Sequence, residues 1–249
     1  MTSGRETELP PLPSALRGLV GPAAWRELRL PTERHAFEAE RARLDSLLPA
    51  GHGRPVVLVP GYLAGDSSMR EIARWLERGD YAVTFAAIGR NVQSSSWAAD
   101  RVAIAIDDAA GGQSGTVILI GHSRGGQQAR VAAARRRDLV DRLITLGSPV
   151  RHHLPRSLPL RGSIEGLRLL ARSPFGPSLD VDAEQAYEAE LFEPFPSSVP
   201  WTTIYSRTDG VVEWQATLDP AAQAIEVDAT HLGLTASVAS FEAMARALD

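Results

Sequence analysis

Three residues could together form an activated serine nucleophile. Each of them follows a segment that is expected to be a β-strand. Ser123 lies in Gly121-His122-Ser123-Arg124-Gly125, which fits the pattern G-x-S-x-G. A serine hydroxyl is a weak nucleophile until a base takes its proton, and His231 is the candidate base. Asp209 would hold the imidazole in one tautomer and stabilise its protonated form. These residues predict acyl transfer through a covalent intermediate.

The serine stands at a turn between a strand and a helix. Val117-Ile118-Leu119-Ile120 is a compact apolar run typical of a buried strand, and a helix is expected over residues 124–137. A sharp turn would push the serine hydroxyl out of the sheet, and the flanking glycines remove side chains that would collide there. The alternative is a glycine-rich turn with an incidental serine. The strand before it and the helix after it favour the nucleophile.

The base and the acid each have competitors. Asp219 and Asp228 compete with Asp209, which is preferred because it lies just beyond a strand and begins the loop 209–212. His231 is preferred because it alone follows a C-terminal strand after a candidate acid. The other histidines fall on an expected helix, in a linker, beside the nucleophile or in an insertion; they are His35, His52, His122, His152 and His153.

The developing oxyanion needs two backbone N–H donors aimed at it. The N–H of Arg124 follows the nucleophile at a helix N-terminus, where the helix dipole also favours negative charge. The second donor is expected to be Tyr62 after the first strand, with Leu63 as the alternative. Leu63 and His122 are also expected to contact the substrate. The Arg124 side chain either pairs with an acidic neighbour, which we favour, or faces the pocket.

Strands and helices alternate along most of the chain, which predicts a mostly parallel sheet with helices on both faces. Helices are expected over residues 69–78, 94–110, 124–137 and 237–248. Strands are expected over residues 56–59, 81–88, 117–120, 143–146 and 224–227, and the core segment 201–209 holds another. Ser123, Asp209 and His231 then fall at carboxyl ends of strands, where such sheets place ligands. Their order along the chain is that of the α/β-hydrolase fold.

Two segments stand outside this alternation. Residues 1–50 form an N-terminal extension, in which a helix over residues 25–48 is expected to pack on the core. Residues 51–249 then form the α/β-hydrolase domain. Within it, residues 150–200 lack a strand and carry short amphipathic pieces at 164–170 and 183–192, which predicts a cap or lid over the sheet edge. The alternative is a surface excursion without a role.

Composition narrows the function classes. A net charge of −4 gives no reason to expect a nucleic acid partner. The chain has no cysteine and no lysine, which excludes disulfides, thiolate chemistry and Schiff-base lysines. The N-terminal residues lack a secretory pattern and no apolar run could span a bilayer, so a cytoplasmic protein without stable membrane insertion is expected. No metal or organic cofactor is needed, and the oligomeric state is left open.

Several segments together resemble the lipase-like α/β hydrolases of actinobacteria. They are Gly121-His122-Ser123-Arg124-Gly125-Gly126, the stretches 143–149 and 205–212, and the shorter stretches 89–91 and 230–234. The similarity covers roughly residues 50–249. It implies an α/β-hydrolase fold with Ser123, Asp209 and His231 as the catalytic triad, and it says less about the substrate.

The leading hypothesis is a serine hydrolase that cleaves a small carboxylic ester through an acyl-enzyme. A thioesterase or an acyltransferase would use the same triad and differ only in the leaving group or the acceptor. A lipase acting at a lipid surface is a further version, because the insertion carries leucines and Phe175 among its arginines. A non-catalytic binding protein on the same fold is the alternative from another class, and the absence of a triad member would mark it.

Overall fold

The computed structural model describes residues 24–111, 115–150 and 180–249. The expected piece at 164–170, His152, His153 and Phe175 lie outside these residues. Six strands form one sheet in the order β2-β1-β3-β4-β5-β6, and every neighbouring pair is parallel. The strands are β1 (Pro55–Val59), β2 (Ala82–Phe85), β3 (Val117–His122), β4 (Val140–Leu146), β5 (Trp201–Tyr205) and β6 (Gln223–Glu226). The predicted parallel sheet is confirmed.

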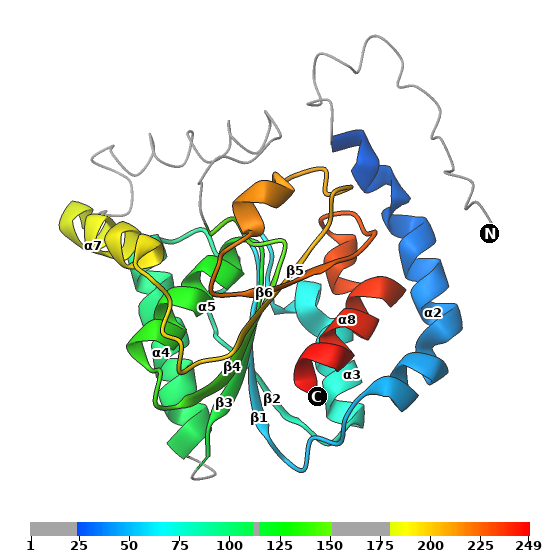
Figure 1. Ribbon diagram of the computed structural model, residues 1–249, viewed down its shortest axis with the longest axis horizontal. Coiled ribbons are helices and arrows are strands. Elements are labelled where there is room, and N and C mark those ends of the chain that lie inside the picture. The colour runs from blue at the N-terminus through cyan, green and yellow to red at the C-terminus, as the bar shows by residue number, and fades with distance from the viewer. Residues whose placement is uncertain (1–23, 112–114, 151–179) are drawn as a thin grey trace.

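Helices cover both faces of the sheet (Figure 1). On one face lie α4 (Ser95–Gly111) and α5 (Arg124–Arg135); on the other lie α3 (Arg70–Arg78) and α8 (Val238–Leu248). Because β1 and β3 are buried on both faces, their residues alternate between two apolar clusters. Val56 and Leu58 pack toward α3 and α8, whereas Val57 and Val59 pack toward α4 and α5. This two-sided burial explains their continuous runs of β-branched and leucine residues.

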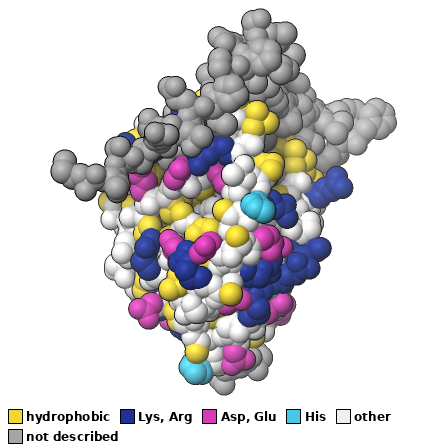
Figure 2. All heavy atoms as spheres, turned by 90° about the vertical axis from the view of Figure 1, so that its right-hand side faces the viewer, with side chains coloured by type: hydrophobic (Ala, Val, Ile, Leu, Met, Phe, Trp, Pro, Cys, Tyr) yellow, Lys and Arg dark blue, Asp and Glu magenta, His cyan; other side chains and the backbone are white. Residues whose placement is uncertain are grey.

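The helix expected over residues 25–48 is divided in two. Residues Ala24–Arg29 form the 3₁₀ helix η1, and α2 spans Leu30–Leu47 with a proline in its first turn. Proline lacks the N–H that a continuing helix would use, so it favours a helix start at this point. α2 packs on α8 through Phe37, whose ring centroid lies 4.5 Å from that of Phe241. The face of the molecule on the side of α2 mixes arginine with acidic side chains (Figure 2). Arg43 of α2 forms an ion pair with Glu242 of α8.

The strand expected over residues 81–88 is shorter than predicted. β2 covers only Ala82–Phe85, because Ala87 adopts a φ of 52° that an extended strand does not permit. β3 and β4 are longer than expected, ending at His122 and beginning at Val140. These shifts of strand ends leave the strands parallel, as predicted.

The described residues 180–200 of the insertion include one helix, which packs on α4 and α5. α7 (Val181–Phe192) buries Tyr187 and Leu191 against residues of α4 and α5. Arg130 of α5 is 2% exposed and donates to the carbonyl oxygens of Glu190 and Glu193 at the C-terminal end of α7. A cation at this end complements the helix dipole. The insertion therefore returns to the sheet along the α4 and α5 layer.

Candidate active site

Ser123 occupies a strained turn between β3 and α5. Its φ of 53° and ψ of −126° lie outside the regions that residues with a Cβ ordinarily adopt. Its N–H donates to the carbonyl oxygen of Leu146 at 2.8 Å, which ties the turn to the end of β4. A Cβ on Gly125 would collide with the carbonyl oxygens of Val59 and Pro60. The glycine therefore lets the Ser123 turn pack directly on the end of β1.

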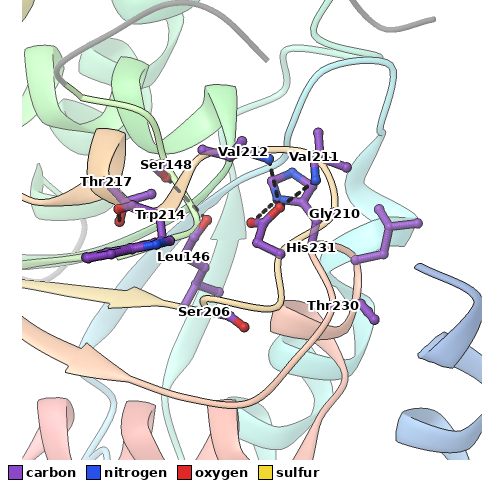
Figure 3. A network of polar contacts seen from close by, with 12 residues as sticks. Leu146, Ser148, Ser206, Gly210, Val211, Val212, Trp214, Thr217, Thr230 and His231 are labelled. Atoms are coloured by element: carbon purple, nitrogen blue, oxygen red, sulfur yellow. Dashed lines mark hydrogen bonds and ion pairs between the residues drawn. The ribbon is translucent and has the colours of Figure 1, made fainter. Parts of the chain in front are cut away.

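Asp209 and His231 form a buried pair beyond the ends of β5 and β6. His231 Nδ1 lies 2.7 Å from Asp209 Oδ2, and the two residues are 4% and 2% exposed, respectively. The other carboxylate oxygen of Asp209 accepts from the N–H groups of Val211 and Val212, each at 2.7 Å (Figure 3). The carboxylate can only accept, so Nδ1 carries the proton and Nε2 is left as the basic nitrogen.

The charge around the His231 ring favours its protonated form. Burial lowers the pKa of His231, but the charge of Asp209 and its hydrogen bond outweigh burial, and Glu27 adds to them. The pKa therefore lies above the usual value for histidine.

A Cβ on Gly147 would lie 3.3 Å from His231 Nδ1, so this glycine keeps the space beside the Asp209–His231 pair free of a side chain.

The two competing carboxylates are engaged elsewhere. Asp228 forms two hydrogen bonds of 3.0 Å with Arg29 and accepts another from Thr208. The hydrogen bond from Arg29 lowers the pKa of Asp228. Asp219 lies 4.0 Å from the guanidinium of Arg130. Of the three aspartates considered, Asp209 is the one that the structure brings to His231.

His122 is a buried neighbour of the pair. Its ring centroid lies 4.8 Å from that of His231, and its Nε2 donates to the backbone carbonyl oxygen of His231 at 3.0 Å. Its Nδ1 is buried without a hydrogen-bond partner. Desolvation, aided by the charge of His231, lowers the pKa of His122 to about 3. His122 is therefore neutral near pH 7 and supports the histidine loop, and its contact with a substrate stays a prediction.

The loop after β1 runs against the Ser123 turn. A Cβ on Gly61 would lie 3.2 Å from Ser123 Cβ, so Gly61 packs against the Ser123 turn. Tyr62 and Leu63 directly follow Gly61 in the chain. Leu63 is exposed, with a φ of 58°. α5 begins at Arg124, so the N–H of Arg124 lies in the first turn of the helix, where the helix dipole favours negative charge. The assignment of Tyr62 and Arg124 as oxyanion donors remains a prediction.

The Arg124 side chain holds a neighbouring loop. It donates to the carbonyl oxygens of Asn91 and Gln93 and to the Ser95 hydroxyl, and its guanidinium lies 5.8 Å from the centroid of the Tyr62 ring. These contacts give the arginine a structural role. These three partners are two backbone carbonyls and a hydroxyl, and the pairing of Arg124 with an acidic neighbour stays a prediction.

A buried amide pair connects the loop after β1 to α5. Asn91 and Gln128 exchange two hydrogen bonds of 2.8 Å, and both residues are fully buried. The Asn91 side chain also donates to the carbonyl oxygen of Pro60 at 2.9 Å. Sequence reasoning missed this pair, since the stretch 89–91 was noted only for its resemblance to a family.

The N-terminal segment also reaches the site. The Glu27 carboxylate accepts from the backbone N–H groups of Gly210, His231 and Leu232. Glu33 accepts from the N–H and the hydroxyl of Thr230. Sequence reasoning missed both glutamates, because nothing local in residues 25–48 indicates a partner about 200 positions away.

The described ranges hold no group of three or more histidine and acidic side chains arranged for a metal ion. No helix in these ranges is both long and apolar enough to cross a bilayer.

The fold is similar to those of solved lipases and hydrolases. Lipase B from Aspergillus fumigatus has a TM-score of 0.58 and 18% identity over 81% of this chain and 55% of that one. The mature lipase BlEst2 from Bacillus licheniformis has a TM-score of 0.58 and 17% identity over 80% and 94%. The mouse alpha/beta hydrolase domain-containing protein 10 has a TM-score of 0.53 and 18% identity over 78% and 88%.

These similarities establish the α/β-hydrolase fold for this chain, which spans about half the length of the Aspergillus lipase. No family model matches the sequence, and no curated protein is significantly similar to it. At identities below 20%, the similarity shows the fold but not the reaction, which has to be argued from the site.

Proposed function

We propose that this protein is a serine hydrolase that cleaves small carboxylic esters through an acyl-enzyme, with Ser123, His231 and Asp209 as its catalytic triad. The observation that carries the proposal is the buried hydrogen bond between Asp209 and His231 at the sheet edge that also bears the strained Ser123 turn. We also propose that the chain belongs to the lipase-like group of actinobacteria.

In the first half-reaction, Ser123 Oγ attacks the ester carbonyl while His231 Nε2 takes the hydroxyl proton. The Tyr62 and Arg124 N–H groups would stabilise the oxyanion. The C–O bond then breaks, and the imidazolium gives its proton to the departing alcohol. In the second half-reaction, His231 takes a proton from water, which attacks the acyl-enzyme carbonyl. The bond from the acyl carbon to Ser123 Oγ then breaks, the imidazolium returns its proton to Ser123 Oγ, and the acid is released.

Asp209 fits its part in this mechanism through its hydrogen bonds. Val211 and Val212 fix one carboxylate oxygen, so that the other meets His231 Nδ1. A carboxylate held in this way keeps the proton on Nδ1 and stabilises the imidazolium once it forms. Leu63 and His122 are the proposed substrate contacts, and residues 150–200 the proposed cap of a domain spanning residues 51–249.

The test is a panel of p-nitrophenyl esters and acyl-thioesters of rising chain length, run on the full chain and its Ser123→Ala and His231→Gln variants. Each variant should lose about 10⁴-fold or more in kcat, because members of a triad act as a unit. Ester turnover that survives in Ser123→Ala would refute the proposal. Turnover of thioesters alone would replace the ester substrate with a thioester.

A further inference from the structure

One carboxylate joins the two loops that carry the candidate acid and base. Glu27 Oε1 accepts from Gly210 N–H at 3.0 Å and from His231 N–H at 2.8 Å, and its Oε2 accepts from Leu232 N–H at 3.0 Å. Gly210 directly follows Asp209, and the other two donors lie on the histidine loop. Figure 3 shows Gly210 beside His231, at the ends of two different strands.

Glu27 belongs to a larger set of contacts from the same segment, which we call the N-terminal clamp. The clamp comprises Arg26, Glu27, Arg29 and Glu33. Arg26 donates to the carbonyl oxygen of Arg207, Arg29 pairs with Asp228, and Glu33 accepts twice from Thr230. All four side chains therefore contact residues 207–210 or 228–232. η1 and the start of α2 lie outside the sheet, so these contacts are additions to the core fold.

We propose that Glu27 is a positioning residue for the hydrolase reaction, which holds the Asp209 and His231 loops at the spacing that their hydrogen bond requires. The inference rests on the proposed function. Hydrogen bonds from an N–H to a carboxylate are stronger than those between neutral groups, and three of them converge on Glu27. Since one carboxylate spans both loops, its removal takes away three of the hydrogen bonds that fix the spacing of the two loops.

The charge of Glu27 has a second consequence. Among the described residues, Asp209 at 2.7 Å and the neutral His122 ring lie against the His231 ring, and the Glu27 carboxylate binds the backbone N–H of His231. Around them lie Glu33 on Thr230 and the pair of Arg29 with Asp228. The negative charge of Glu27 favours the imidazolium, so its removal should lower the pKa of His231.

The experiment compares the full wild-type chain with Glu27→Gln, Glu27→Ala and a control, Glu38→Gln. Glu38 is an exposed acid of α2 that pairs with Arg41 away from the site. Glu27→Ala should lower kcat by about 10- to 100-fold with little change in KM, because a displaced catalytic group slows the chemical step. Glu27→Gln keeps one acceptor oxygen and should fall between this variant and wild type. Glu38→Gln should stay within about twofold, as an exposed ion pair contributes little.

A second readout needs no turnover. The proton between His231 and Asp209 is followed by NMR against pH, with the His231→Gln variant identifying its resonance. The pKa of His231 should be lower in Glu27→Gln than in wild type, while Glu38→Gln leaves it unchanged. A structural role of Glu27 in folding alone would lower thermal stability without moving this pKa in the folded protein.

The outcomes separate the two proposals. An unchanged pKa together with an unchanged kcat in both Glu27 variants overturns the positioning role, whatever the wild-type activity. A wild-type chain that turns over no ester or thioester overturns the proposed function, and the NMR titration still decides whether Glu27 acts on His231. A lowered pKa and a lowered kcat in a folded Glu27→Gln variant support the positioning role.

Discussion

Replacing Asn91 with alanine should loosen the loop that carries the proposed oxyanion donor. The Asn91 amide binds the carbonyl oxygen of Pro60 and exchanges two hydrogen bonds with Gln128. Alanine would leave three buried groups without these partners: the Pro60 oxygen and both polar atoms of the Gln128 side chain. Each unsatisfied buried group costs about 1–3 kcal/mol before the structure relaxes. Asn91 also has a φ of 51°, which asparagine tolerates better than alanine.

We therefore expect Asn91→Ala to lower the free energy of unfolding by about 3–5 kcal/mol. Urea unfolding followed by circular dichroism measures this change. Gln93→Ala, in the same loop but exposed, is the matched control and should change stability by less than about 0.5 kcal/mol. Because Asn91 and Gln128 are partners, the double alanine variant should lose less than the two single losses combined.

The reasoning fails if the free energy of unfolding of Asn91→Ala lies within about 1 kcal/mol of the wild-type value. The buried amide pair could not then be formed as described. It also fails if the effects of Asn91→Ala and Gln128→Ala add without coupling. The same variant should lower kcat by about tenfold, because Pro60 leads into the loop of Tyr62.

Two further predictions concern the turn itself. As the pH falls from 6.5 toward about 3, the unfolded chain protonates His122 while the buried ring stays neutral, so stability falls. His122→Gln should therefore flatten urea-derived stability against pH by up to about 1.4 kcal/mol per unit, and an unchanged slope would contradict the low pKa. The raised pKa of His231 makes stability rise as the pH falls, and it does so equally in the wild type and in His122→Gln. In Gly125→Ala the new methyl group would collide with backbone oxygens, whereas in Gly126→Ala it would chiefly meet the Ser148 side chain. Gly125→Ala should therefore lower the melting temperature more than Gly126→Ala does. The reverse order of melting temperatures would refute this prediction.

The fold and the pairing of Asp209 with His231 could be predicted from local patterns in the sequence. Runs such as Val117-Ile118-Leu119-Ile120 report burial on both faces of a parallel sheet, which the structure confirms. Strand ends were less accessible, since the end of β2 depends on the positive φ of Ala87, which no pattern in residues 81–88 indicates. Asp209 was chosen over Asp228 from its place after a strand, and the structure brings it to His231.

The supporting residues could not be predicted, because their partners lie far away in the sequence. Glu27 reads as an ordinary helix residue, and its role is visible only once η1 lies against residues 210 and 231. Asn91 and Gln128 each read as polar residues near a turn and in a helix. Their pairing depends on how the loop after β2 crosses α5, which tertiary packing decides.

The most direct test of the central claim is the site of covalent labelling by a fluorophosphonate probe. The full chain is treated with the probe, and peptide mass spectrometry locates the adduct. We predict stoichiometric labelling at Ser123 that His231→Gln slows strongly, since the serine reacts fast only with its base in place. Labelling at another residue, or none on folded wild-type protein, would contradict the account.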